Sequence, residues 1–345
     1  MEFQKPERLK KGDRVAVVSL SSGILGEAPF LHKLRIAERR LAEEFGLETV
    51  VMPHALKGAD FVAAHPALRA KDLTDAFADE RIAAVFCAIG GDDAIRTLPF
   101  VDYEILRRNP KIFMGYSDST VNHFMMHKAG LVSFYGPCVM CEFGEYVRMP
   151  AYTVNAVKSL LFGDSAGYEI APSPVWSDDW IPWDESNQGK EYRYKPDQRG
   201  YELLQGSGIV SGPLMGGCLD VLPMLLATPL WIPAADWAGA ILFLETSEEK
   251  PNPNLFTYIL RNFAAQGILR RLSGIVIGKP QGEVYYEEYK QAILQVVARE
   301  EGLSLPVLYN VNFGHARPNG VIPMGVTAQL DCGAKTLRLL ESAVL

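Results

Sequence analysis

The stretch IAAVFCAI (82–89) is apolar at every position and runs directly into Gly90 and Gly91. A strand that is apolar along its whole length has both faces buried, which is typical of a parallel sheet covered by helices on each side. Residues 70–77 carry apolar side chains at helical spacing and precede this strand. A helix followed by a fully buried strand predicts an α/β domain.

The same alternation of strand and helix extends along the first half of the chain. The other strand-like runs are RVAVVSL (14–20), ETVVM (48–52), KIFMG (111–115) and LVSFYG (131–136). Their order predicts a doubly wound α/β domain with a parallel sheet over residues 1–165. Ligands of such domains bind at the carboxyl ends of the strands, so we expect a site in the loops after residues 20, 89 and 115.

The remainder of the chain has a different pattern. Residues 166–206 contain three tryptophans among prolines and polar residues and sustain neither periodicity, which predicts a Trp-rich linker or loop. Residues 207–345 return to regular segments, with the strands AILFLE (240–245) and GIVIGK (274–279) and a final hairpin turning at Gly333. They predict a smaller, mixed α/β C-terminal domain.

Composition excludes some classes of function. The chain has 345 residues and a formal charge of −7, without a basic stripe, which argues against a nucleic-acid polymer as partner. No run approaches the length of about eighteen apolar residues that a membrane helix needs. The N-terminal residues MEFQKPERLKKGDR are polar and lack the apolar run of a signal peptide, so we expect a cytoplasmic protein without a membrane partner.

The cysteines and histidines give little indication of a metal. Five cysteines are an odd number, and only Cys138 and Cys141 form a C-x-x-C pair. A zinc site would need a second pair or histidines at ligand spacing, so buried free thiols are favoured over a redox or metal role. His123 and His127 are four residues apart, but no glutamate follows His123 as in a metalloprotease helix. We expect no metal site.

A candidate nucleophile lies in KIFMGYSDST (111–120). Ser117 follows Gly115 where an apolar strand gives way to a helix. A serine on such a turn exposes its hydroxyl at the edge of the sheet, where backbone N–H groups and the helix dipole face developing negative charge. Taken alone, a strand-end Gly-x-Ser is more often a helix N-cap.

The glycines after the first buried strand are candidates for binding negative charge. Gly90 and Gly91 precede a short helical segment, so their N–H groups could face the same crevice as Ser117 and form an oxyanion hole. A tight strand-to-helix turn is the alternative. The segment is not a G-x-G-x-x-G motif, and no P-loop lysine follows, so binding of nucleotide phosphates is poorly supported.

A nucleophilic serine needs a base and a group that orients this base. His315 lies in the Gly- and Pro-rich segment NVNFGHARPNGVIPMG (310–325), and loops on rigid scaffolds often carry catalytic groups. Glu245 ends the apolar strand 240–245, where a carboxylate is costly to bury unless it is paired. A helix cap or a place in a catalytic triad are the two interpretations.

Taken together, five segments resemble the LD-carboxypeptidase family of serine peptidases, which includes murein tetrapeptide carboxypeptidases and microcin C immunity proteins. They are IGGDD (89–93), GYSDST (115–120), GPLMGGCLDVLPMLLATP (212–229), ILFLET (241–246) and NFGHARPNGVIPMG (312–325). The resemblance covers nearly the whole chain in the right order.

This resemblance implies a serine carboxypeptidase with a Ser–Glu–His triad. The triad residues would be Ser117, Glu245 and His315, and the backbone N–H groups of Gly91 and Asp118 would form the oxyanion hole. The resemblance also implies a homodimer that needs no cofactor. One departure is Cys218, where relatives often carry asparagine, which puts the hydrogen bonding of that loop in doubt.

The Trp-rich segment WSDDWIPW (176–183) resembles the microcin-immunity branch more closely. In that branch an aromatic side chain stacks on a nucleobase while the enzyme cleaves the bond between a C-terminal aspartyl residue and a modified nucleotide. Gly90, Trp180 and Trp183 would then bind a small peptide or nucleopeptide substrate. The alternatives are that the tryptophans only hold the linker to the body, that the enzyme is a murein tetrapeptide LD-carboxypeptidase of cell-wall recycling, or that the protein binds a small molecule without catalysis.

Overall fold

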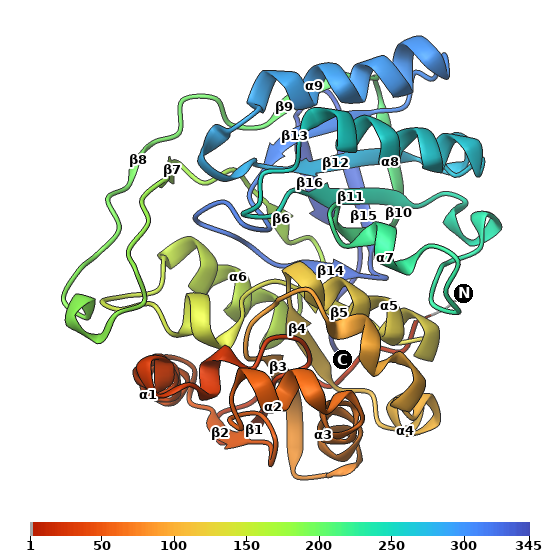
Figure 1. The fold of residues 1–345 in the computed structure, drawn as a ribbon. Coiled ribbons are helices and arrows are strands. Elements are labelled where there is room, and N and C mark those ends of the chain that lie inside the picture. Colours follow the sequence, from red (N-terminus) through yellow and green to blue (C-terminus); the bar gives the residue numbers. More distant parts are fainter. Residues whose placement is uncertain (1–2) are drawn as a thin grey trace.

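Two β-sheets, each built mainly from one half of the chain, lie one above the other in the computed structural model, which describes residues 3–345 (Figure 1). The first sheet has the strand order β14-β5-β4-β3-β1-β2. Its strands are β1 (Arg14–Val18), β2 (Glu48–Val51), β3 (Ile82–Cys87), β4 (Ile112–Gly115), β5 (Ser133–Tyr135) and β14 (Ile322–Met324). Strands β1 to β5 are parallel, and β14 runs antiparallel to β5. The order reverses at β1 and β3, so the loops after these two strands flank the switch point where ligands of doubly wound sheets bind.

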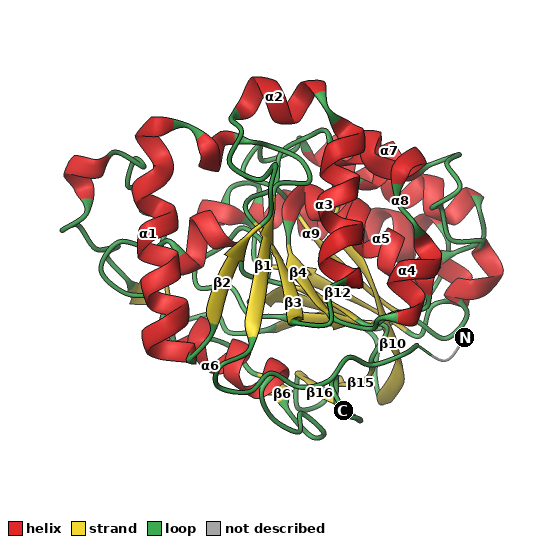
Figure 2. Ribbon diagram, turned by 90° about the horizontal axis from the view of Figure 1, so that it is seen from below, coloured by secondary structure: helices red, strands yellow, loops and turns green. Residues whose placement is uncertain are grey.

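Helices flank the first sheet on both sides, with α1 and α6 on one side and α3, α4 and α5 on the other (Figure 2). The helices of this half are α1 (Leu31–Arg40), α2 (Ala59–Ala64), α3 (Pro66–Ala78), α4 (Tyr103–Arg108), α5 (Thr120–Ala129) and α6 (Ala151–Leu161). All four residues of β4 and all but one of β3 are buried, as their apolar sequences require. The prediction of a doubly wound, parallel α/β arrangement is confirmed.

The second sheet has eight strands in the order β6-β16-β15-β10-β11-β12-β13-β9. They are β6 (Glu169–Ile170), β9 (Glu202–Gln205), β10 (Ile209–Cys218), β11 (Ile241–Glu245), β12 (Gly274–Gly278), β13 (Val307–Val311), β15 (Thr327–Asp331) and β16 (Thr336–Leu339). Strands β10 to β13 are parallel, and the flanking strands are antiparallel. The helices of this half are α7 (Leu222–Leu225), α8 (Pro253–Ala265) and α9 (Tyr286–Leu294). The prediction of a mixed α/β second half is confirmed, and β15 and β16 form the expected hairpin at Gly333.

The Trp-rich segment projects beside both sheets as a long excursion that contains the small strand pair β7 (Val175–Trp176) and β8 (Lys195–Pro196) (Figure 1). Its two ends are more than a linker, because β6 and β9 complete opposite edges of the second sheet. These strands are two and four residues long, which is too short for a periodic pattern to reveal them in the sequence.

Two contacts join the two halves of the molecule, a strand pairing and a hydrogen bond. Strand β14 comes from the predicted C-terminal domain but pairs with β5 of the first sheet. In the other direction, the Cys218 N–H donates a 2.9 Å hydrogen bond to Thr120 Oγ1 at the start of α5. A Cβ atom on Gly217 would lie 2.5 Å from Thr120 Cγ2, so the close approach depends on glycine. No helix within residues 3–345 is long and apolar enough to cross a membrane.

Candidate active site

Ser117 occupies a strained turn between β4 and α5. Its φ angle is +62°, in the left-handed region that a non-glycine residue rarely adopts. A single turn of 3-10 helix, Ser117–Ser119, follows and leads into α5. The Ser117 N–H donates a 3.1 Å hydrogen bond to the hydroxyl of Tyr135 on β5. This geometry is that of a nucleophile elbow, which the sequence left open against a simple helix cap.

The loop after β3 packs directly against this elbow. A Cβ atom on Gly90 would lie 2.8 Å from the Ser117 Cβ, and one on Gly91 would lie 2.4 Å from Ser21 Oγ. Both positions therefore need glycine, and the loop brings its backbone to the serine. The same residues also form a strand-to-helix turn, so the two interpretations of this segment are compatible.

The side chain of Asp118 fixes the loops around the serine. It is fully buried and accepts hydrogen bonds from Ser21 Oγ (2.6 Å) and from the Ala94 N–H (2.7 Å). It thereby ties the loops after β1, β3 and β4 to one another. Burial raises the pKa of this carboxyl group above its ordinary value, although its hydrogen bonds act in the opposite direction. The sequence suggested a role only for the backbone of this residue.

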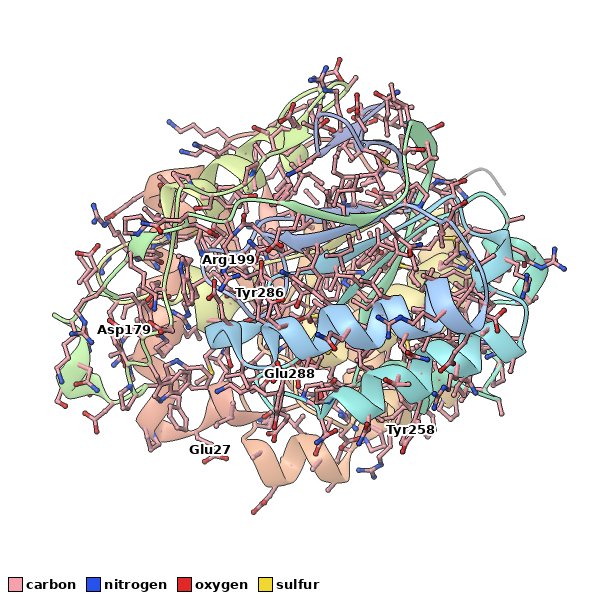
Figure 3. The ribbon with its side chains drawn as sticks, turned by 90° about the horizontal axis from the view of Figure 1, so that it is seen from above. Glu27, Asp179, Arg199, Tyr258, Tyr286 and Glu288 are labelled. Carbon is pink, nitrogen blue, oxygen red and sulfur yellow. The ribbon has the colours of Figure 1, made fainter. Side chains whose placement is uncertain are left out.

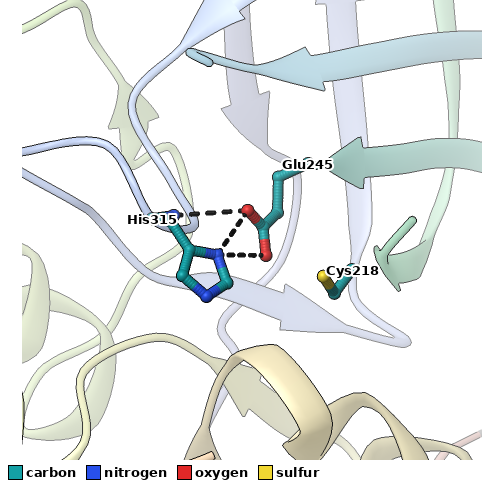
Figure 4. Close-up of side chains that lie close together, drawn as sticks. All are labelled: Cys218, Glu245 and His315. Atoms are coloured by element: carbon teal, nitrogen blue, oxygen red, sulfur yellow. Dashed lines mark hydrogen bonds and ion pairs between the residues drawn. The ribbon is translucent and has the colours of Figure 1, made fainter. Parts of the chain in front are cut away.

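Glu245 and His315 form a close pair (Figure 4). The His315 Nδ1 lies 2.8 Å from Glu245 Oε2 and 3.1 Å from Oε1, and the His315 backbone N–H donates to Oε2 at 3.2 Å. A Cβ atom on Gly314 would lie 2.4 Å from the carboxyl carbon of Glu245, so glycine at this position allows the chain to wrap around the carboxylate. Glu245 is only 1% exposed, and its hydrogen bonds with His315 offset the free-energy cost of burying a carboxylate.

The second nitrogen of the imidazole also faces a carboxylate. The His315 Nε2 lies 2.9 Å from Glu248 Oε2, in the loop that follows β11. Burial alone would lower the pKa of His315, but the carboxylates of Glu245 and Glu248 outweigh it and raise this pKa well above its ordinary value. Ser117 Oγ, in contrast, forms no hydrogen bond with His315 in this structure. No signal in the sequence indicated Glu248.

Three adjoining cavities meet around these groups. One of about 240 Å³ contains Ser117 and His315 together with Gly90, Gly91, Trp180 and Trp183. A second of about 290 Å³ shares Trp180, Glu248 and His315 with it. A third of about 610 Å³ shares Ser117 and Gly91 with the first but contains no tryptophan. The candidate nucleophile thus lines two of the three cavities, which gives room for two parts of a substrate.

The three tryptophans of the excursion have different environments. Trp176 is buried, and the ammonium groups of Lys195 and Lys279 lie 3.9 and 4.4 Å from its ring centre. Trp180 is 61% exposed and packs at 5.4 Å and 52° against Trp183, which contacts the body of the protein. Trp176 therefore anchors the excursion, while Trp180 and Trp183 line the cavity.

Cys218 lies beside the acid–histidine pair, and the ligand atoms of Cys218, Glu245 and His315 are within 4.8 Å of one another (Figure 4). Both oxygens of Glu245 already accept hydrogen bonds, from His315 and from Tyr135. Burial also raises the pKa of the Cys218 thiol well above its ordinary value, whereas a metal would need the thiolate. These three side chains therefore fit a hydrogen-bonded Glu245–His315 pair beside a neutral Cys218 thiol better than they fit a zinc site.

Within residues 3–345, the remaining cysteines and histidines form no cluster that could hold a metal ion. Cys138 and Cys141 are free and buried, although both line the 240 Å³ cavity. His123 is buried beneath the elbow, where its ring nitrogens contact Ser133 Oγ at 2.8 Å and the Gly115 carbonyl at 2.9 Å. Burial lowers the pKa of His123 to about 4, so it is a neutral core residue.

A serine on a strained strand-to-helix turn, in one cavity with a histidine that is paired to a buried carboxylate, is an arrangement typical of serine hydrolases. The LD-carboxypeptidase N-terminal domain matches residues 15–136, and the LD-carboxypeptidase C-terminal domain matches residues 211–330. The chain therefore belongs to the LD-carboxypeptidase family of serine peptidases, as its sequence motifs indicated.

Relatives from both branches of the family resemble the chain. A probable murein peptide carboxypeptidase from Bacillus subtilis is 30% identical over 99% of this chain and 95% of its own length. The microcin C7 self-immunity protein MccF from Escherichia coli is 29% identical over 79% of this chain and 78% of its own. The crystal structure of an MccF-like protein from Streptococcus pneumoniae in complex with AMP has a TM-score of 0.87 and 36% identity, and covers 95% of this chain and 98% of its own.

Proposed function

We propose that the chain hydrolyses an amide-type bond near the C-terminus of a small peptidyl- or aminoacyl-nucleotide, with Ser117, Glu245 and His315 as its catalytic triad. The observation that carries the proposal is the Glu245–His315 pair, whose histidine lines the same cavity as the strained Ser117 and the exposed ring of Trp180. A nucleophile, an oriented base and a flat apolar surface are the groups that this reaction needs.

In the first step, Ser117 Oγ attacks the scissile carbonyl carbon while His315 Nε2 takes the hydroxyl proton. The carbonyl oxygen becomes an oxyanion, which would accept hydrogen bonds from the N–H groups of Gly91 and Asp118. Neither of these groups donates to a protein acceptor within the described residues. As the intermediate collapses, the leaving amine takes the proton from His315, and an ester remains on Ser117.

In the second step, His315 accepts a proton from water, and the resulting hydroxide attacks the ester carbonyl. The acyl group then leaves, and the proton returns to Ser117. Glu245 holds Nδ1–H throughout and stabilises the imidazolium that forms in each half-reaction. Because Glu248 occupies Nε2 in the structure, its carboxylate has to move aside before the first proton transfer. Its side chain is 58% exposed, which leaves it room to do so.

Two observations support a nucleotide as part of the substrate. The relative from Streptococcus pneumoniae was crystallised with AMP. In this chain, Trp180 and Trp183 line the cavity beside Ser117, and Trp180 exposes most of its ring. Stacking of a base on such a ring is worth roughly 1–3 kcal/mol.

Cleavage of a murein tetrapeptide is the second candidate function, and Arg317 favours it. A murein enzyme must hold the free carboxylate of a terminal D-alanine, for which a guanidinium is well suited. Arg317 lines the cavity that contains Ser117 and His315, although it already donates to Glu145 Oε2 at 2.9 Å and stacks on Tyr192. The murein-type relative matches nearly the whole chain.

A fluorophosphonate probe followed by peptide mapping tests the nucleophile. We expect label on Ser117 and none on a folded Ser117→Ala variant. A folded wild-type protein that resists labelling would be evidence against an activated serine and would favour reversible binding without catalysis. From the family resemblance we also propose a cytoplasmic homodimer, which fractionation of the native cells and light scattering of the purified protein would test.

A further inference from the structure

Glu248 lies where the three cavities of the candidate site adjoin, since it lines all of them and Ser117 lines two. Its Oε2 is 2.9 Å from His315 Nε2, the nitrogen that has to accept the proton of Ser117. The contact with Glu248 and the reaction exclude each other, because His315 Nε2 cannot pair with the Glu248 carboxylate and accept the Ser117 proton at the same time. A productive substrate must therefore draw this carboxylate away from the imidazole.

The cavity of about 610 Å³ shares Ser117 with the tryptophan-lined cavity, contains no tryptophan itself and is strongly acidic. Asp92, Asp220, Glu248 and Glu249 all line it, and its lining includes no lysine, arginine or histidine. Within residues 3–345, none of the four carboxylates lies within 4 Å of a lysine or arginine nitrogen. Asp220 accepts hydrogen bonds from Ser247, yet its Oδ1 is buried without a partner.

The geometry also assigns this cavity to one side of the scissile bond. Under the proposed function, the nucleobase lies against Trp180 and Trp183 on one side of Ser117. The acyl group then extends from the serine into the acidic cavity, which is lined by the same serine but by neither tryptophan. The acyl part of the substrate meets Glu248 and the other carboxylates.

We propose that Glu248 makes this site selective for acyl groups that carry a positive charge. An ammonium group in the acidic cavity gives the Glu248 carboxylate a partner in place of His315, and so frees Nε2 for catalysis. An acidic acyl group leaves Glu248 on the histidine and is repelled by the neighbouring carboxylates. This inference rests on the proposed function, because it takes the acyl group to lie opposite the tryptophans.

The test compares four sulfamoyl adenosines that differ only in the acyl group: lysyl, alanyl, N-acetylalanyl and aspartyl. Their acyl groups carry charges of +2, +1, 0 and 0 at neutral pH. We expect kcat/KM to follow this charge, with lysyl cleaved at least about tenfold better than aspartyl. Glu248→Gln should reduce the lysyl-to-aspartyl ratio by about tenfold or more, because the amide loses the charge that selects.

Glu288→Gln is the matched control, since it removes one acidic charge from an exposed position on α9 outside the three cavities (Figure 3). It should leave both the ratio and the activity unchanged. A wild-type enzyme that prefers aspartyl, or a ratio that Glu248→Gln and Glu288→Gln change equally, would overturn the assignment.

Calorimetric binding of the same four compounds to Ser117→Ala separates this inference from the proposed function. Binding that follows acyl charge, in the absence of turnover by the wild type, supports the acidic subsite and contradicts the proposed reaction. Turnover without any dependence on acyl charge supports the proposed reaction and contradicts the acidic subsite. An absence of both binding and turnover would overturn both.

Discussion

Tyr135 and Glu245 share a hydrogen bond of 2.5 Å across the two halves of the molecule. The same tyrosine hydroxyl accepts the N–H of Ser117 at 3.1 Å. One buried side chain on β5 thus connects the elbow of the proposed nucleophile with the carboxylate of the proposed triad. The proposed Ser117, Glu245 and His315 come from both halves of the chain, and this bond helps to fix their relative positions.

Tyr135→Phe removes this connection while keeping the ring. We expect kcat/KM to fall by about 10–100-fold, by analogy with the loss of groups that orient metal-binding side chains in metalloenzymes. The free energy of unfolding should fall by about 1–3 kcal/mol, because a buried carboxylate oxygen loses a donor. Steady-state kinetics and urea unfolding measure the two effects. Tyr103→Phe is the control, since that hydroxyl is buried without a partner; equal effects of the two variants would contradict the role of Tyr135.

Much of the fold could be predicted from the sequence because fully buried parallel strands have a strong pattern. The apolar runs that predicted β1, β3, β4 and β11 coincide with strands. Strand β14 was not foreseen, because three residues after a Pro-rich loop carry no periodicity and the pairing with β5 is a long-range contact.

The candidate site was only partly predictable for a related reason. Ser117, Glu245 and His315 lie in segments with unusual local sequences. Tyr135, by contrast, lies in the apolar run LVSFYG and is indistinguishable there from a core residue. Glu248 lies in the polar loop TSEEK, where a glutamate is expected to be solvated. The roles of both residues arise from tertiary contacts with groups that are distant in the sequence.

Glu245→Gln tests the proposed orienting group. The amide keeps the size of the side chain but can hold the imidazole in the wrong tautomer, so we expect kcat to fall by about 10⁴-fold, as in the well-studied serine protease case. Circular dichroism should show that the variant is folded. Near-full activity of Glu245→Gln would mean that another group orients His315.

The pH dependence of kcat/KM tests the proposed role of His315. The imidazole must be neutral to accept a proton, so kcat/KM should fall as the pH drops through its pKa in the free enzyme. Because Glu245 and Glu248 raise this pKa well above 6.5, the fall should begin on the alkaline side of that value. The same shift stabilises the folded protein below pH 6.5, and this contribution is lost as the pH rises through the folded pKa.

Glu248→Gln should move the kinetic transition of this profile to lower pH, because it removes one of the two carboxylates that raise the pKa of His315. Glu288→Gln provides the reference profile, since it removes a charge of the same sign from the surface. A transition that stays in place in Glu248→Gln would show that the contact between Glu248 and His315 does not persist in the working enzyme.

Trp180→Ala tests which substrate the cavity serves. Loss of the stacking surface should raise the transition-state free energy for an aminoacyl sulfamoyl adenosine by about 1–3 kcal/mol, and kcat/KM for this substrate should fall accordingly. The free energy of unfolding should stay nearly constant, because the ring is 61% exposed. Trp176→Ala is the structural counterpart. It should lower the free energy of unfolding by about 3 kcal/mol, because that ring is buried and contacts the ammonium groups of Lys195 and Lys279. A murein tetrapeptide is the competing substrate, and its rapid cleavage by both wild type and Trp180→Ala would place the enzyme in the murein branch, with Arg317 as the group to examine next.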